Sequence, residues 1–494
     1  MFDLLLSGLE SILTFKALLM IVIGAAIGLI FGVIPGLGPT VAATLLISFT
    51  YSMDPAMSMI LIASVYVSAT FGGSQTAILY NIPGSAENAC TAIDGYRMTK
   101  KGQVSDALGA AIYASFFGGV LGCLVLIFFT PFLAKVSYLF GAYDYFAFAL
   151  FGLAAVIGMQ KSILKGTISA LIGITIGMVG LSPIDGSAVL TFGSSELYGG
   201  IKLIPVMLGM YAVAEVFHQA HANFKEEFHF DEKMKIKAPS AKIIGKIKYV
   251  ILRSSVVGIL IGILPGVGAV LANYIGYSVE EKVQTASPKK EKQIGTGDVR
   301  GVAAPEAANN AAAVATFIPM LALGIPGGAV TAILLGVFEV HGIQAGPLLF
   351  STNSDLVYTL FMGLLLINIF IIAIGYIEIK GIQRLLHVPK GIIFPIMLVF
   401  AVVGSFVVAN SFIDVLIMLL FGIIGITLKE NGFSVPIMIL GIVLGDILES
   451  NFARLVLSNF RFVDCFTNPI GLCFMLLSIS FLVVPVVQKR RKKA

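Results

Sequence analysis

Long apolar runs separated by short polar loops dominate the chain. A membrane-spanning helix needs about 20 mostly apolar residues, because the hydrocarbon core of a bilayer is about 30 Å thick. The runs fall at 17–34, 38–52, 57–80, 107–134, 144–160, 166–181, 200–217, 249–264, 267–279, 307–323, 327–340, 355–379, 391–409, 411–428, 432–448 and 467–487. This pattern predicts an all-α polytopic membrane protein with about 10–12 spanning helices.

Composition supports the membrane assignment. Hydrophobic residues make up 57% of the 494 residues and charged residues only 12%, whereas about a quarter of a soluble domain is charged. The composition therefore excludes a large soluble enzyme. The net charge of +5 is spread along loops and a basic tail, so no nucleic-acid partner is expected.

Polar segments divide the chain into four parts. A lysine-rich linker at 218–248 separates a first membrane repeat, 1–217, from a second, 249–466. A final helix and a basic tail follow at 467–494. A charged stretch at 280–300 interrupts the second repeat and is interpreted as an insertion that the first repeat lacks.

Two short motifs recur in the same order in both halves. The sequence GLIFGVIPGLG at 28–38 matches GILIGILPGVG at 258–268, and NIPGSA at 81–86 matches GIPGGA at 324–329. A single Pro-Gly pair would be weak evidence. Two different Pro-Gly motifs in matching order, both within apolar runs, indicate an internal duplication.

The basic residues predict the orientation of the two halves. Loops rich in Lys and Arg remain in the cytoplasm, which places Arg97, Lys100 and Lys101 inside, together with the 218–248 linker and the C-terminal tail. The corresponding loop of the second half, 341–354, has neither Lys nor Arg and should lie outside. The halves then have opposite orientations, and inverted repeats are typical of secondary transporters.

The Pro-Gly pairs predict four re-entrant or broken elements. Proline lacks a backbone donor, and glycine beside it weakens the helix further. A break in lipid leaves polar backbone groups that must be satisfied by protein, water or a ligand. Exposed helix N-termini suit an anion, and freed carbonyl groups suit a cation.

Polar residues at these breaks are the candidate site. The expected substrate-binding residues are Ser74, Gln75, Asn81, Pro83, Gly84, Ser85, Pro326, Gly327, Gly328 and Thr331. The expected ion-coupling residues are Pro35, Gly36, Gly38, Thr40, Pro265, Gly266, Gly268, Glu306, Asn309 and Asn310. Substrate carboxylates should meet backbone N–H groups at 84–85 and 327–328. Glu306 and Glu87 are candidates for cation or proton coupling because membrane-embedded acids are costly; the alternative is that both cap helices at the interface.

Several motifs resemble the TctA-type large membrane subunit of the tripartite tricarboxylate transporter family. They are GVAAPEAANNAA at 301–312, IPMLALGIPGG at 318–328, HGIQAGPLLF at 341–350, IPGLGPTVAA at 34–43, NIPGS at 81–85, DGYRMTKKG at 94–102, VGLSPIDG at 179–186 and LTFG at 190–193. The chain departs from the family pattern at Ser182, near Val189 and at Gln75, which weakens an assignment to citrate.

The resemblance implies a permease of the bacterial cytoplasmic (inner) membrane that takes up small organic carboxylates. It implies a small membrane subunit and a periplasmic solute-binding protein as partners, and an Na⁺ or H⁺ gradient as the driving force. No cofactor is expected apart from coupled sodium. The chain carries no G-x-x-x-x-G-K-[ST] phosphate loop, consistent with transport that does not use ATP.

Two alternatives differ in class. An intramembrane aspartic protease would use Asp144 and Asp446, but Val443 stands where its motif requires glycine, so no enzyme is expected. A passive organic-anion channel or a scaffold subunit also tolerates broken helices, and dependence of uptake on an ion gradient would discriminate between these and a transporter.

Overall fold

The protein is almost entirely helical in the computed structural model, which describes residues 1–160, 162–221, 238–286, 294–377, 390–407 and 410–491. Eight described helices are long and apolar enough to cross a membrane, and five shorter helices are also apolar. The predicted all-α polytopic fold is therefore confirmed. Two of the shorter helices, Gly38–Thr50 and Ala329–Val340, are short because each begins directly after a break.

The first half contains ten α-helices and a small β-hairpin in its described part. These elements are α1 (Phe2–Ile12), α2 (Phe15–Val33), α3 (Gly38–Thr50), α4 (Pro55–Tyr80), η1 (Ala86–Asn88), α5 (Ala89–Lys100), α6 (Val104–Ser137), α7 (Ala142–Gly158), α8 (Ile163–Gly177), β1 (Gly180–Leu181), β2 (Ala188–Val189), η2 (Ser195–Leu197), α9 (Leu203–Met207), η3 (Leu208–Val213) and α10 (Ala214–His221). Strands β1 and β2 are antiparallel.

The second half is helical throughout its described part. Its elements are α11 (Ala241–Gly262), α12 (Gly268–Thr285), α13 (Val299–Ala315), α14 (Phe317–Leu323), α15 (Ala329–Val340), α16 (Leu349–Thr352), α17 (Ser354–Ile377), α19 (Lys390–Val407), α20 (Phe412–Glu430), α21 (Val435–Leu457), η4 (Phe462–Phe466) and α22 (Pro469–Arg491). Much of the predicted 218–248 linker lies outside the described residues; helix α10 continues to His221 and α11 starts at Ala241.

Glycine residues allow close packing of α2 against α4 and of α11 against α13. Gly28 and Gly32 of α2 touch the backbone of α4, and Gly258 and Gly262 of α11 touch the backbone of α13. Small residues at four-residue spacing let membrane helices approach closely. The two glycine pairs lie at matching distances before Pro35-Gly36 and Pro265-Gly266, and the duplication itself stays a prediction.

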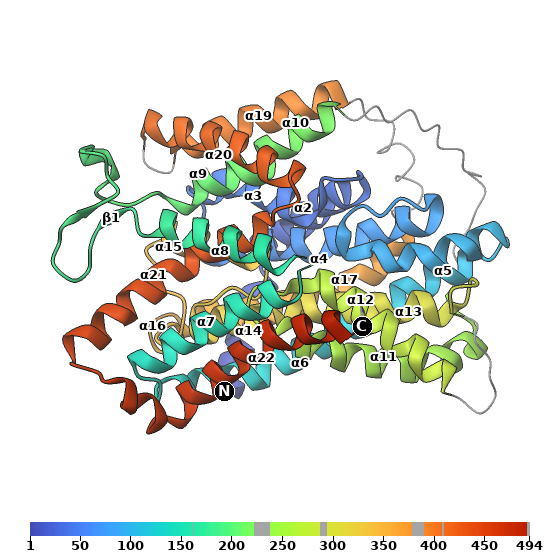
Figure 1. The fold of residues 1–494 in the computed structure, drawn as a ribbon. Helices are drawn as coiled ribbons and strands as arrows, with labels where there is room; N and C mark the ends of the chain where they lie inside the picture. The colour runs from blue at the N-terminus through green and yellow to red at the C-terminus, as the bar shows by residue number, and fades with distance from the viewer. Residues whose placement is uncertain (161, 222–237, 287–293, 378–389, 408–409, 492–494) are drawn as a thin grey trace.

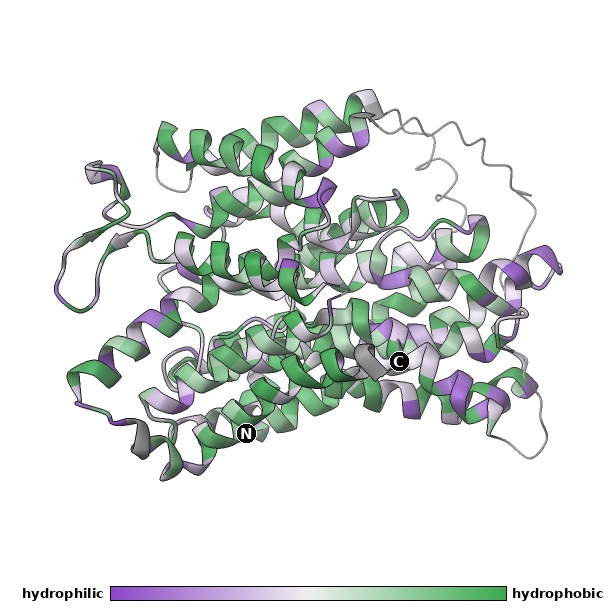
Figure 2. Ribbon diagram, viewed as in Figure 1, coloured by the Kyte–Doolittle hydropathy of each residue, from purple (hydrophilic) through white to green (hydrophobic). Residues whose placement is uncertain are grey.

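The remaining helices pack in a similarly matched way. Helix α8 lies along α21, and α20 lies along α9 and η3, while α22 covers α7. Figure 1 shows α5 and the start of α11 at one end of the molecule, here called the α5 end. The β1–β2 hairpin lies at the opposite end, here called the hairpin end. Figure 2 shows apolar residues along the helices between these ends, as a bilayer requires.

Candidate functional site

The four Pro-Gly breaks join as two pairs, one pair in each half. In the first half, the Gly36 N–H donates to Gly84 O at 3.1 Å. In the second half, the Gly266 N–H donates to Pro326 O at 2.9 Å and the Gly268 N–H to Gly327 O at 3.0 Å. Each break therefore satisfies part of the backbone that the other exposes.

The helices that lead into the second break of each pair end alike. Asn81 caps α4 with φ of 60°, and its N–H donates to Ala77 O. Gly324 caps α14 with φ of 72°, and its N–H donates to Met320 O. Asparagine is one of the few residues besides glycine that adopts this left-handed conformation readily, so the sequence difference leaves the geometry unchanged.

Glu306 lies on α13 with no exposed side-chain surface. Thr91 Oγ1 donates to Glu306 Oε1 at 2.5 Å, and Ser115 Oγ donates to Glu306 Oε2 at 3.0 Å. The acid is therefore buried against hydroxyl groups of two first-half helices, α5 and α6, rather than at an interface as a helix cap.

Glu87 forms a second buried acidic position beside the first break. Thr70 Oγ1 donates to Glu87 Oε2 at 3.0 Å, and Asn309 Nδ2 donates to Glu87 O at 2.9 Å. Asn88 Nδ2 donates to Thr70 O at 2.8 Å, and Ser85 Oγ donates to Asn88 Oδ1 at 3.0 Å. The amide of Asn309 thus connects the second half to the first break.

Oxygen atoms suitable for a cation occur in this region. Within the described part of the chain, Asn309 Oδ1 and Asn310 Oδ1 are buried and accept no hydrogen bond. Amide and carboxylate oxygens are the ligands that hard cations prefer. The described residues contain no group of three His, Cys, Asp or Glu side chains arranged for a metal ion.

The predicted substrate-binding residues divide between two environments. Ser74 and Gln75 are buried on α4, where Ser74 Oγ donates to Phe71 O at 2.5 Å. Thr331 caps α15, where its Oγ1 accepts from the Gly328 N–H at 2.9 Å. The Gly84 N–H donates to Gly73 O at 3.1 Å. A substrate carboxylate would have to replace these partners at residues 84 and 328, and the predicted N–H contacts stay predictions.

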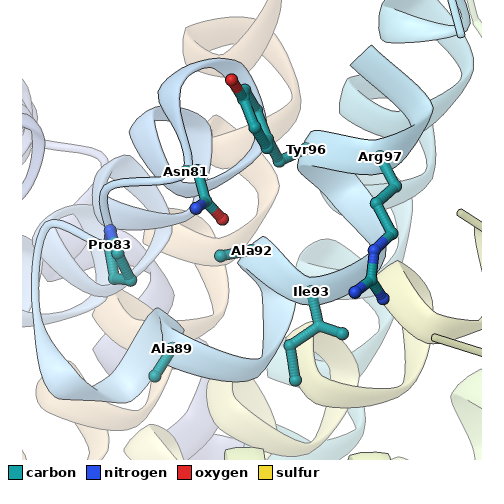
Figure 3. A pocket seen from close by; sticks show the side chains of 7 residues that line it. All are labelled: Asn81, Pro83, Ala89, Ala92, Ile93, Tyr96 and Arg97. Carbon is teal, nitrogen blue, oxygen red and sulfur yellow. The ribbon is translucent and has the colours of Figure 1, made fainter. Parts of the chain in front are cut away.

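Two cavities lie against the breaks at opposite ends of the molecule. A cavity of about 380 Å³ at the α5 end is lined by Asn81, Pro83, Ala89, Ala92, Ile93, Tyr96 and Arg97. Figure 3 shows the break residues on one side of it and the α5 residues on the other. A cavity of about 1160 Å³ at the hairpin end includes Leu323, Gly324, Leu335 and Glu339 in its lining.

The linings of both cavities include residues at matching distances from the two recurring Pro-Gly motifs. Asn81 and Gly324 hold matching positions before the two breaks. With the same spacing of 243 residues (324 − 81), Ala92 and Tyr96 of the small cavity correspond to Leu335 and Glu339 of the large one. Helices α5 and α15 thus border a small cavity at one end of the molecule and a large one at the other.

An ion pair lies next to the first break and is connected to it through Gln219. Lys429 Nζ lies 2.5 Å from Glu215 Oε2. Gln219 Nε2 donates to Glu215 Oε1 at 2.9 Å and to Pro35 O at 3.1 Å. The π-helical turn η3 ends two residues before Glu215, and such turns often mark functional positions.

The site contains residues that the sequence did not single out. Thr70, Thr91 and Ser115 contact the two buried acids, but each is one hydroxyl in a long helix. Thr91 lies 215 positions before Glu306 in the chain, and Ser115 lies 191 positions before it. Only their polarity within apolar helices could have marked them, and Ser and Thr often serve merely to bond their own helix.

Comparisons with known proteins agree with the resemblance in the motifs. Residues 18–440 match the family model described as the tripartite tricarboxylate transporter TctA family. An Agrobacterium vitis protein described as an uncharacterized 52.8 kDa protein in the TAR-I ttuC' 3' region is 33% identical over 491 residues, which cover 98% of this chain and 96% of the relative. An uncharacterized protein in the TAR-II ttuC' 3' region of the same organism is 33% identical over 237 residues, 48% of this chain and 96% of the relative. No solved structure matches the chain.

Proposed function

Because the chain belongs to the tripartite tricarboxylate transporter TctA family, we propose that it is the permease subunit of a binding-protein-dependent secondary transporter. Its substrates are tricarboxylates or other small organic carboxylates, and an Na⁺ or H⁺ gradient drives their uptake. It works with a small membrane subunit and a periplasmic solute-binding protein in the bacterial inner membrane. Its C-terminus and the α5 end face the cytoplasm, where basic loops are retained.

The observation that carries this proposal is the pair of matched breaks with unequal cavities at opposite ends. In secondary transporters with inverted repeats, substrate binds between broken helices, and the repeats exchange conformations to move the opening. The wide cavity at the hairpin end then corresponds to a state open to the periplasm. Substrate carboxylates bind at the breaks, where helix N-termini favour negative charge.

The coupled cation binds in the neighbouring oxygen-rich region. Glu306 supplies the negative charge, and the unpartnered Oδ1 atoms of Asn309 and Asn310 supply neutral ligands. Since α13 contacts α4, α5 and α6 of the other half, cation binding on α13 can influence how the halves pack. Coupling arises when the cation binds one arrangement more tightly than the other.

Uptake of radiolabelled di- and tricarboxylates into proteoliposomes tests the proposal, with both partner subunits present and with or without an imposed Na⁺ or H⁺ gradient. We expect accumulation that follows one of the gradients and requires the binding protein. A passive channel would instead equilibrate substrate without any gradient, and a scaffold subunit would leave transport by its partners intact when it is omitted. Either result would contradict the proposal.

A further inference from the structure

The loop before α13 wraps a carboxylate from the other half of the protein. Asp94, a fully buried residue of α5, accepts hydrogen bonds from three backbone N–H groups of this loop. The donors are Gly295 at 2.9 Å, Gly297 at 2.7 Å and Asp298 at 3.0 Å. Tyr277 Oη of α12 donates to the same carboxylate at 2.8 Å.

Glycine makes this arrangement of the loop accessible. Gly295 and Gly297 have φ of 83° and 93°, a region that other residues rarely adopt. Successive N–H groups that point into one concavity form a nest that binds anions. Here the anion is an internal carboxylate, and hydrogen bonds to a charged acceptor are roughly twice as strong as neutral ones.

The carbonyl groups of the same loop bind cations of α5. The Arg97 guanidinium donates to Gly295 O, and Lys101 Nζ donates to Thr296 O at 2.6 Å. Helix α5 and its C-cap residue thus present one carboxylate and two cations, which the loop binds through its N–H and C=O groups. The contact joins the two halves at the α5 end, beside the narrow cavity that Arg97 also lines.

The loop is held in turn at the start of α13. Asp298 is the N-cap residue, and its Oδ1 accepts from the Arg300 backbone N–H and from Arg300 Nε, both at 2.9 Å. Burial by itself raises the pKa of Asp298, but the hydrogen bonds from Arg300 outweigh it and keep that pKa below the ordinary value. Asp298 therefore remains ionised at neutral pH and fixes the loop against α13.

The opposite end has no equivalent contact in the described residues. Helix α15 corresponds to α5, and with the spacing of 243 residues the counterpart of Asp94 is Val337. Valine offers no charge to hold a loop. The end that has the acid has the narrow cavity, and the end that lacks it has the wide one.

We propose, on the basis of the proposed function, that Asp94 is a positioning residue that holds α5 against the 294–298 loop and thereby keeps the cytoplasmic end of the transport path closed. Thr91 lies three residues before Asp94 on α5 and hydrogen-bonds Glu306. Helix α5 therefore links the buried cation position to the contact between Asp94 and the 294–298 loop. Release of α5 from the loop opens the cytoplasmic side.

Replacing Asp94 with Asn tests this assignment, with Cys90 as the reporter. Cys90 lies on α5 with 3% exposure, in a small buried cluster with Tyr277 and Ile294 next to the contact between Asp94 and the loop. We expect labelling of Cys90 in inverted membrane vesicles by an impermeant maleimide to accelerate roughly tenfold or more, because the loss of a hydrogen bond to a charged group shifts a two-state population by about that factor. Cys465→Ser and Cys473→Ser are introduced first, because these two cysteines are more exposed and would also be labelled. Adding Cys90→Ala then shows which part of the labelling belongs to Cys90.

A second cysteine separates gating from general loosening. Cys123 on α6 has no exposed surface, and its labelling should stay unchanged while that of Cys90 rises. Asp106→Asn, at an exposed position on the same end of α6, is the matched control and should change neither rate. If Asp94→Asn exposed Cys123 and Cys90 equally, Asp94 would have only a structural role and the proposal would be overturned.

A glycine variant tests the loop side of the same contact. A Cβ at Gly297 would lie 3.2 Å from the Arg97 backbone, at a φ of 93° that alanine rarely adopts. Gly297→Ala should therefore also accelerate Cys90 labelling, and it decides the question if Asp94→Asn does not fold. Unchanged labelling in the folded variants would overturn the proposal. Because labelling needs no substrate, a failure to transport carboxylates would be recognised separately.

Discussion

Replacing Glu306 with Gln is expected to lower gradient-driven carboxylate uptake roughly 100-fold or more, since removing one partner of a buried charge pair costs about 3–5 kcal/mol. The variant keeps the shape of the side chain and loses the negative charge that a bound cation would face. Glu306 is fully buried and accepts from Thr91 and Ser115. Initial uptake rates in proteoliposomes over a series of Na⁺ and H⁺ gradients provide the measurement.

The dependence on the gradient distinguishes coupling from folding. We expect the small residual uptake of Glu306→Gln to respond less to the driving cation, while thermal unfolding in detergent stays close to that of the parent protein. Glu430→Gln, at an exposed position at the end of α20, is the matched control and should transport normally. Full gradient dependence in a stable Glu306→Gln protein would assign the cation site elsewhere.

The hydroxyl groups around Glu306 give a graded version of this result. Ser115→Ala removes one donor to the carboxylate and leaves its charge. A lost hydrogen bond to a charged group corresponds to about 1.5–3 kcal/mol, so the concentration of cation that gives half-maximal uptake should shift by about tenfold or more. An unchanged half-maximal concentration would mean that Ser115 only packs α6 against α13.

The breaks could be predicted from the sequence because their cause is local. Proline and glycine disrupt a helix wherever they occur within an apolar run, so the four positions follow from the motifs themselves. The partnership of Pro35-Gly36 with Pro83-Gly84 could not be predicted in the same way. All four breaks have the same Pro-Gly sequence, so the local sequence does not indicate which break pairs with which.

The contacts between the halves could not be predicted from the sequence for a related reason. The 280–300 stretch reads as a charged insertion, yet it contains the end of α12 and the loop that binds Asp94. Gly295 and Gly297 indicate a turn, but only the folded chain brings them to a carboxylate about 200 residues away. Burial of Asp94 likewise depends on packing that local patterns do not encode.

The acids illustrate the same limit. Glu306 and Glu87 were equally credible as interfacial helix caps and as buried coupling groups, because depth in the membrane is not a property of the local sequence. The exposed fraction of Glu306, 0%, and its two hydroxyl donors decide in favour of a buried group. Whether it binds the driving cation is the question that the variants above address.

Replacing Gly84 with Ala should disrupt the first pair of breaks and have the largest effect on stability of any small substitution proposed. A Cβ at residue 84 would lie 1.8 Å from Gly32 O and 2.7 Å from Gly73 Cα. Overpacking in a core typically costs about 1–3 kcal/mol, and here the obstacles are backbone atoms that cannot rotate away. We expect a lower thermal unfolding temperature in detergent and loss of uptake.

The duplication predicts a parallel result in the other half. Gly327→Ala would place its Cβ 2.6 Å from Thr316 Cα and should also destabilise the protein, though less than Gly84→Ala because the approach is less severe. Gly199→Ala, where a Cβ would have nothing within 4 Å, is the control and should leave the unfolding temperature unchanged. A stable, transporting Gly84→Ala protein would show that close contact between α2 and the break is dispensable, and the paired breaks would then lose their role as the framework of the site.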